Sequence, residues 1–385
     1  MRDFFRAVLR FLREADVFLF VLCLASSILG LLLISSVLNN ASNASGNEAT
    51  VQTVALILGI FLFISFSYID IDIIADKSVF LIVFSALFIA TLQLWGVGME
   101  ETGNRAWLRF FNIGIQPAEV TKITYIIITA KMIANHKERK SLNTFSSLLQ
   151  IILVFLLFFG LIVVVSDDFG SALIYLFILV VMLFIGGVKL RWFALGGAVI
   201  AAISPLMYNN FFSDLQKDRI KAPFFPDDVD PYRMGVLWQS EKSVQAITAG
   251  GFTGQGLGNG RMTQGGVIPA QHTDFIFSAA GEELGFIGCM LVVMLLLAMI
   301  SRCIYVGMKS NNTLGVLVCT GVAAMLISQT LENIGMCLGI LPVIGITLPF
   351  FSYGGSSLVT GFAAAGIVSG IKMRPKPARY RTLWN

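Results

Sequence analysis

Charged residues are scarce in this sequence. Of its 385 residues, 13% are Asp, Glu, Lys or Arg and 56% are hydrophobic, and the mean hydropathy is +0.81. A soluble protein of this length needs a much larger charged surface. The composition therefore excludes an ordinary soluble domain and predicts a protein that crosses a membrane many times.

Cysteines are few and follow no metal-binding or disulfide pattern. All five lie within or beside apolar runs: Cys23, Cys289, Cys303, Cys319 and Cys337. Free cysteine in such places behaves as a small apolar side chain, and no spacing resembles a zinc or disulfide framework. We therefore expect these cysteines to be buried packing residues.

The glycine-rich stretch GGFTGQGLGNG, residues 250–260, lacks the features of a nucleotide-binding loop. Its glycines alternate instead of following G-x-G-x-x-G, no strand precedes them, and no Gly-Lys-Ser/Thr closes a P-loop. Glycine does reach backbone conformations that other residues avoid. The stretch is therefore predicted to be a structured, tightly turning loop.

Apolar runs of about 20 residues recur along the chain and predict about ten membrane spans. They lie at about 16–38, 50–69, 77–97, 117–135, 144–165, 169–187, 191–209, 275–304, 313–340 and 350–372. The predicted fold is an all-α polytopic membrane protein that forms one domain over residues 1–385. It would begin with a cytoplasmic amphipathic segment at 1–15 and end in a basic cytoplasmic tail at 373–385.

Lysine and arginine are unevenly distributed between the two sides of these spans. An even number of spans places both chain ends on the same side, and 18 of the 27 Lys and Arg residues fall there. Positive residues favour the cytoplasm. We therefore expect both termini to be cytoplasmic, with a large extracellular loop at 210–274 between the seventh and eighth spans.

The other nine basic residues fall outside or at the outer rim, in two groups. They are Arg105, Arg109, Lys122, Lys217, Arg219, Lys221, Arg233, Lys242 and Arg261. Long loops cross the membrane regardless of their charge, which would explain these positions without any function. Alternatively, the grouped cations bind an anionic ligand such as a phosphate or pyrophosphate head group.

Glu119 and Lys122 lie at the start of the fourth span, in the stretch QPAEVTKI at residues 116–123. Pro117 suits a first helical position, and a spacing of three places both charges on one helix face. Charges in a bilayer are costly unless they face the bundle interior or a watery cavity, so a functional role is the first hypothesis. A structural ion pair near the outer interface is the alternative.

The stretch VIPAQHTDFIFSAAGEELGFIG, residues 267–288, carries charge where the outer loop enters the eighth span. Asp274 lies at the helix start, where an acid is commonly a cap or a partner of the helix dipole. Beside a cation-rich loop it could equally serve as a general base. His272 fits an interfacial hydrogen bond better than a metal ligand or proton relay. We expect Glu282 and Glu283 to support the site.

The stretch LPVIGITLPFFSYGGSS, residues 341–357, interrupts the apolar pattern with two prolines and three glycines. Irregular backbone at membrane depth occurs only where it is buried in protein or lines a cavity, and we favour a cavity. Ser352 and Ser356, near its end, are candidate substrate contacts. Gly366-x-x-x-Gly370 in the last span is typical of a helix-packing face.

Together these motifs resemble the SEDS family (shape, elongation, division and sporulation), which contains the RodA, FtsW and SpoVE peptidoglycan polymerases. The resemblance covers nearly the whole chain. It rests on Gly103-x-x-x-Trp107 with Arg105, and on QPAEVTK, GGFTGQGLGNG, HTDFIFSAAGEELGFIG and ENIGMCLGILPVIGITLPFFSYGGSS. The last two are long and highly specific, and the compact chain ends favour a RodA-like member.

The resemblance implies an inverting membrane glycosyltransferase that polymerises lipid II at the outer face of the bacterial plasma membrane, for elongation or division. It also implies a class B penicillin-binding transpeptidase as partner, with other elongation or division complex proteins. For cofactors it implies at most a divalent cation, Mg²⁺ or Mn²⁺, and no organic cofactor. No nucleic-acid partner is expected.

The resemblance also assigns site residues. Asp274 corresponds to the family's essential aspartate, expected to be the catalytic base, and Glu119 and Lys122 correspond to its Glu-x-x-Lys pair. The residues expected to bind substrate are Arg105, Trp107, Arg109, Glu119, Lys122, Lys242, Arg261, His272, Ser352 and Ser356.

The sequence departs from the family pattern at Thr102, Ala106, Ser166 and Ala270, which weakens any functional role for the last three but does not touch Asp274. The main alternative function is a lipid II flippase. Transporters place polar sites near the bilayer midplane, often in internal repeats. Here the charges gather towards the outer face and the sequence shows no repeat, which favours an enzyme. A catalytically silent scaffold for a transpeptidase is a further alternative.

Overall fold

The computed structural model describes residues 11, 13–39, 47–98, 104–110, 113–210, 212–232 and 234–374. Most of the expected amphipathic segment at 1–15 and of the basic tail at 373–385 lies outside these residues. So do Thr102, Gly103 and Arg233, which were singled out in the sequence.

A helix lies at each of the ten predicted spans, which confirms an all-α polytopic membrane protein. The helices are α2 (Val17–Asn39), α3 (Glu48–Tyr68), α5 (Ser78–Ala90) followed by α6 (Leu92–Trp95), α8 (Pro117–Glu138), α9 (Phe145–Ser166), α10 (Phe169–Gly186), α11 (Leu190–Asn210), α16 (Ile276–Lys309), α17 (Thr313–Cys337) and α18 (Gly355–Met373). Within the described residues, nine spans are long and apolar enough to cross a membrane. The helix α8 has the length but carries more charge, including Glu119 and Lys122.

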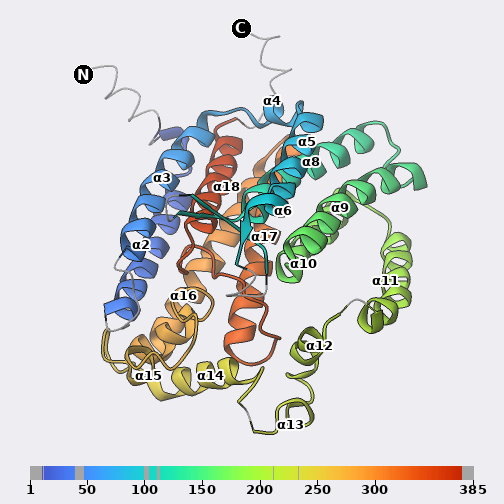
Figure 1. Ribbon diagram of the computed structural model, residues 1–385. Coiled ribbons are helices and arrows are strands. Elements are labelled where there is room, and N and C mark those ends of the chain that lie inside the picture. Colours follow the sequence, from blue (N-terminus) through green and yellow to red (C-terminus); the bar gives the residue numbers. More distant parts are fainter. Residues whose placement is uncertain are drawn as a thin grey trace.

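The first and last described spans meet at one end of the bundle. The Asp16 amide donates to Ser369 Oγ at 3.0 Å, and Lys372 Nζ donates to the Ala15 carbonyl at 3.2 Å. Figure 1 shows the helices of the 210–274 loop gathered at the opposite end: α12 (Asp214–Lys221), α13 (Pro226–Val229), α14 (Trp238–Gly250) and α15 (Arg261–Gln264). This arrangement fits an even number of spans; which end is cytoplasmic stays a prediction.

The helix α11 is the least packed span. None of its residues is buried, and Figure 1 shows it standing beside the bundle, between α10 and the short helices of the loop. Its apolar side chains are therefore left uncovered by the rest of the described chain.

A small antiparallel sheet departs from the all-α prediction. It has the order β1-β2-β3, with β1 at Gly96–Val97, β2 at Trp107–Phe110 and β3 at Ile113–Ile115. Leu108 pairs with Ile115 and is buried, whereas Arg109, one residue further, is exposed. Strands of two to four residues are too short for their alternation to be recognised in a sequence.

The helix α16 is broken at Gly285, whose φ of 68° and ψ of −164° are not helical. The glycine-rich loop fills this break: the amides of Gln255 and Gly256 donate to the carbonyls of Glu282 and Glu283, and the Phe286 amide donates to the Gly251 carbonyl. The loop thus satisfies backbone groups that the break frees, as a buried irregular segment requires. The prediction of a structured loop is confirmed, since four of its glycines have positive φ: Gly251, Gly254, Gly256 and Gly258.

Small residues let α3 and α18 pack closely. A side chain at Gly366 would come within 2.6 Å of the Phe63 carbonyl oxygen, and one at Gly370 within 3.0 Å of the Phe66 carbonyl oxygen. The predicted helix-packing face is confirmed. All five cysteines are free and buried, which confirms their interpretation as packing residues.

Candidate active site

Asp274 lies in a tight turn immediately before α16. The amides of Thr273, Asp274 and Phe275 all point to the Ala270 carbonyl, with N–O distances of 3.0–3.3 Å, and Ala270 itself has a φ of 51°. The Asp274 carbonyl accepts a hydrogen bond from Asn333 Nδ2 of α17 at 2.7 Å. The turn is therefore fixed by its own backbone hydrogen bonds and by α17, which is distant in sequence.

The Asp274 carboxyl does not cap α16. The residue at the cap position is Phe275, and no side chain makes a capping hydrogen bond there. Instead the carboxyl is half-buried against the irregular 341–354 segment, where a side chain at Gly345 would come within 3.5 Å of Oδ2. The capping alternative from the sequence is therefore wrong, and the general-base alternative remains.

The surroundings of Asp274 make it more basic than an ordinary aspartate. Burial raises the pKa of its carboxyl to about 6; the Thr273 hydroxyl acts in the opposite direction and the Asp168 carboxylate in the same direction. A carboxyl with this pKa is mostly ionised near pH 7 and still accepts a proton readily. This is the compromise that general-base catalysis favours.

Asp168 was not singled out in the sequence, yet its charge acts on Asp274 and it accepts a hydrogen bond from Gln116, at the start of α8. It is 5% exposed. It caps α10, because its Oδ1 accepts from the Ser171 amide at 2.9 Å and its Oδ2 from the Ser171 hydroxyl at 2.7 Å. Gln116 Nε2 donates to the same Oδ2 at 3.0 Å. Burial raises the pKa of Asp168, and so does the Glu119 charge, while the two hydrogen bonds from Ser171 and the Lys122 charge lower it.

The predicted Glu119–Lys122 pair forms inside the bundle. Lys122 Nζ lies 2.6 Å from Glu119 Oε1, and the two residues are 0% and 6% exposed. Both charges act on Asp168. The pair is therefore buried and its charges act on the Asp168 carboxylate; its functional role stays a prediction, with a structural ion pair as the alternative.

Glu332 is a second acid that the sequence reading missed. It lies on α17, one residue before the Asn333 that holds Asp274, and its Oε1 accepts a hydrogen bond from the Ser328 hydroxyl at 2.9 Å. The charges of Lys122 and Asp168 act on its carboxyl. A lone acid in an apolar span should have attracted attention, because charges at membrane depth are commonly functional.

His272, Arg109 and Ser356 border the same site. The rings of His272 and Tyr353 lie 5.6 Å apart, and the Tyr353 amide donates to the His272 carbonyl at 2.8 Å. The Arg109 charge acts on Tyr353. Ser356 Oγ accepts from the Gln116 amide and donates to the Gly114 carbonyl, which ties β3 and α8 to the start of α18. Burial lowers the pKa of His272, so its ring is neutral near pH 7.

Trp107 and Arg109 lie on the face of β2 opposite the buried Leu108, because side chains alternate along a strand. The Trp107 ring covers Gly114 of β3, where an added side chain would come within 3.1 Å of it. Arg105 precedes the strand, and its amide donates to the Ser166 carbonyl at 3.0 Å. Arg105, Trp107 and Arg109 thus lie at the end of the bundle where Ser166 and Asp168 lie.

Ser352 is used by the fold. Its hydroxyl accepts from the Leu348 amide at 2.8 Å, and its carbonyl accepts from Gln52 Nε2 of α3 at 3.1 Å. The irregular segment around it is buried in protein, with Leu348 and Phe351 at most 1% exposed. Ser352 therefore shapes the segment that backs Asp274.

Three of the remaining cations, Lys217, Lys221 and Lys242, contact residues close to them in the sequence. Lys242 lies over the Trp238 ring at 4.7 Å and donates to Gln245. Lys217 and Lys221 both lie over the Tyr208 ring. Arg261, on α15, is exposed. Of the nine outer cations, the contacts described above bring Arg109 and Lys122 into the surroundings of Asp274.

Glu282 and Glu283 bind the residues that follow the glycine-rich loop, and their support of the site stays a prediction. Glu282 accepts from the amides of Met262 and Thr263, both at 2.8 Å, and from the Thr263 hydroxyl at 2.7 Å. Glu283 accepts from Ser36 of α2 and from Gln264 Nε2 at 2.7 Å. Both are buried, so their charges are met by hydrogen bonds instead of solvent.

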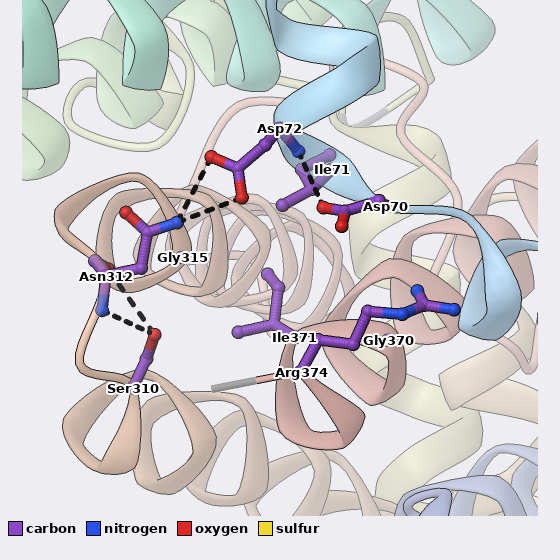
Figure 2. A pocket seen from close by; sticks show the side chains of 9 residues that line it. All are labelled: Asp70, Ile71, Asp72, Ser310, Asn312, Gly315, Gly370, Ile371 and Arg374. Atoms are coloured by element: carbon purple, nitrogen blue, oxygen red, sulfur yellow. Dashed lines mark hydrogen bonds between the residues drawn. The ribbon is translucent and has the colours of Figure 1, made fainter. Parts of the chain in front are cut away.

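In the part of the chain that the structure describes, no three His, Cys, Asp or Glu side chains converge as a metal site would require. A small, partly open pocket lies at the other end of the bundle, where α4 (Ile71–Ala75), the α16–α17 connection and the end of α18 meet (Figure 2). Asn312 Nδ2 donates to the Asp72 carboxylate across it. This pocket is not part of the Asp274 site.

Comparison with known sequences identifies relatives over most of the chain. A family model described as "Cell cycle protein", FTSW_RODA_SPOVE, matches residues 16–376. The probable peptidoglycan glycosyltransferase FtsW of Trichlorobacter lovleyi is 34% identical over 295 residues, which cover 76% of this chain and 75% of that protein. The peptidoglycan glycosyltransferase MrdB of Escherichia coli K12 is 30% identical over 279 residues, which cover 72% of this chain and 74% of MrdB.

Solved structures share the fold. A chain from a peptidoglycan synthase complex, in which polymerization and crosslinking are structurally coordinated, superposes with a TM-score of 0.78 at 27% identity, covering 93% of this chain and 97% of that one. The rod shape determining protein RodA of Thermus thermophilus superposes with a TM-score of 0.67 at 24% identity, covering 93% of this chain and 96% of that one.

Proposed function

This chain belongs to the FtsW/RodA/SpoVE family of cell cycle proteins, and we propose that it is a peptidoglycan glycosyltransferase of the bacterial plasma membrane. Its substrate as donor and acceptor is lipid II, polymerised at the outer face for elongation or division. The observation that carries the proposal is the placement of Asp274 at the mouth of the bundle. There its carboxyl has a pKa of about 6 and lies near Asp168, while the Lys122 and Glu119 charges act on Asp168 in turn.

In the proposed reaction the acceptor sugar hydroxyl attacks the anomeric carbon of the donor sugar. Asp274 takes the hydroxyl proton as the new glycosidic bond forms, and the bond to the diphosphate breaks with its electron pair on the leaving oxygen. A single displacement inverts the anomeric centre. General-base assistance of this kind is worth roughly 10²–10⁴-fold in rate.

The leaving diphosphate needs positive charge nearby. We assign this role to Arg109; the support is that it is exposed on β2 and that its charge acts on Tyr353, beside His272. Lys122 is buried and paired with Glu119, so it acts on the site through its field. Lys242 and Arg261, further out in the loop, are candidates for earlier contact with the lipid head group.

A divalent cation, Mg²⁺ or Mn²⁺, would supply additional neutralisation of the diphosphate. The described residues offer no three-ligand site, and Asp274 is the residue that would contribute a carboxylate to such an ion. Loss of polymerisation in EDTA, restored by Mg²⁺ or Mn²⁺, would support this role.

We further propose a class B penicillin-binding transpeptidase as the partner that crosslinks the product, together with other proteins of an elongation or division complex. The support is the structural neighbour, a chain from a peptidoglycan synthase complex. Exposed apolar faces on the spans, including Phe61, Phe80 and Leu87, offer membrane-embedded surface for a partner helix as well as for lipid.

The test is a polymerisation assay with labelled lipid II, in which the purified chain is assayed alone and with a class B partner. The expected product is a ladder of uncrosslinked glycan strands when the partner's transpeptidase is blocked. A protein-only liposome assay of lipid II scrambling runs in parallel. Scrambling without any polymer would contradict the proposal and favour the flippase alternative.

A further inference from the structure

Glu332 is half-buried on α17, but one oxygen of its carboxyl is fully buried. Its Oε1 accepts from the Ser328 hydroxyl at 2.9 Å, but its Oε2 is buried and has no hydrogen-bond partner among the described residues. A buried carboxylate oxygen without a partner is costly. Such a group in a native protein calls for an explanation, and a functional role is one.

Lys122 has N–H donors that no acceptor among the described residues meets. An ammonium group carries three N–H donors, and within the described residues its single hydrogen bond goes to Glu119 Oε1. Lys122 is 0% exposed, so bulk solvent cannot fill the other two donors. Its helix α8 packs against α17, and its charge acts on the Glu332 carboxyl. Two unmet donors of Lys122 and the unmet acceptor of Glu332 therefore lie on neighbouring helices, and the charge of the first residue acts on the second.

We infer that Glu332 is a positioning residue for the proposed glycosyl transfer and acts through Lys122. Glu119 binds the ammonium from its own helix, and Glu332 attracts it from the facing helix. Together they hold the positive charge between α8 and α17, beside Asp168, where it lowers the cost of ionised carboxylates near Asp274. Glu332 touches no reacting atom in this account, and the inference rests on the proposed function only for its activity readout.

A role that depends on charge can be distinguished from one that depends on packing or hydrogen bonding. The two predict opposite orders of activity for two variants of Glu332. Glu332→Gln keeps the length of the side chain and an acceptor for Ser328 but removes the charge. Glu332→Asp keeps the charge and shortens the side chain. If Glu332 acts by charge, Asp should be the better replacement; if it only fills space, Gln should be.

The experiment measures kcat and KM for lipid II polymerisation by the parent, both variants and a matched control, Glu138→Gln, at the exposed far end of α8. We expect Glu332→Gln to lower kcat roughly 5- to 30-fold, the effect of a lost interaction between coupled charges, with KM nearly unchanged. Glu332→Asp should recover most of kcat. Equal or better activity of Glu332→Gln than of Glu332→Asp would overturn the inference.

A second measurement does not depend on catalysis. Thermal unfolding of Glu332→Gln, Lys122→Met and the double variant forms a cycle. Coupling through Lys122 predicts that the shift of the double variant differs from the sum of the single shifts. Additive shifts in the unfolding temperature would overturn the inference even if polymerisation is confirmed. Coupled shifts in a chain that makes no polymer would contradict the proposed function alone.

Discussion

Removing Lys122 should leave a buried carboxylate without its counter-ion and destabilise the bundle severely. The perturbation is Lys122→Met, which keeps the volume of the side chain and removes its charge. At an effective dielectric constant of about 20, unit charges 2.6 Å apart attract by about 6 kcal/mol. Desolvation offsets much of this attraction, and breaking a buried pair from one side typically costs about 3–5 kcal/mol.

The assay is equilibrium or thermal unfolding in detergent or nanodiscs of the parent, Lys122→Met, Glu119→Gln and the double variant. The double variant should recover much of the loss, because both charges are then absent from the interior. The matched control is Lys131→Met, which breaks a pair with the same 2.6 Å separation whose Asp76 side chain is 65% exposed. An exposed pair is worth about 0–1 kcal/mol. If Lys122→Met costs no more than Lys131→Met, the reasoning about burial is refuted.

Three further predictions concern Asp274 and the broken helix. The polymerisation rate should rise with pH and reach half its maximum near pH 6. The reason is that burial raises the pKa of Asp274 to about 6 and only the ionised carboxyl is a base. A midpoint near pH 4 in a pH–rate profile would contradict this. Since the folded-state pKa lies above the ordinary value, stability from protonated Asp274 is present below about pH 4 and lost as the pH rises through 6. Asp274→Asn should therefore be more stable than the parent at pH 7.5, by up to about 3 kcal/mol, with the gain vanishing near pH 4 in a thermal-shift series. Gly285→Ala should lower the free energy of unfolding by about 1–3 kcal/mol and increase proteolysis of the 210–274 loop. The reason is that a Cβ there would come within 2.3 Å of the Gly254 amide nitrogen. Unchanged protease sensitivity would count against the loop's role in closing the break.

Spans were predictable because each needs about 20 apolar residues in a row, a signal carried locally by the sequence. Even α8 was found, although its Glu119 and Lys122 make it less apolar, and the i,i+3 spacing predicted their contact. The packing face at Gly366 and Gly370 was also predictable from a local signal, because both residues lie on one side of a single helix.

The interior of the site was less predictable because its contacts join distant segments. Asp168 reads as an ordinary helix cap, and it does cap α10; only the fold shows that its charge also reaches Asp274 and Lys122. Glu332 gave a local signal, an acid in an apolar span, but nothing in the sequence places it beside α8. The break at Gly285 was hidden for the same reason, because the loop that fills it comes from residues 250–256.

The most direct test of the account is the polymerisation rate of Asp274→Asn at pH 7.5, assayed with the class B partner and labelled lipid II. Asn keeps the size and hydrogen bonding of the side chain but cannot accept the proton. The matched control is Asp214→Asn, on the exposed outer helix α12. The account predicts a loss of roughly 10²-fold or more for Asp274→Asn, with folding intact and Asp214→Asn close to the parent. A folded Asp274→Asn that polymerises at the parent's rate would contradict the central claim.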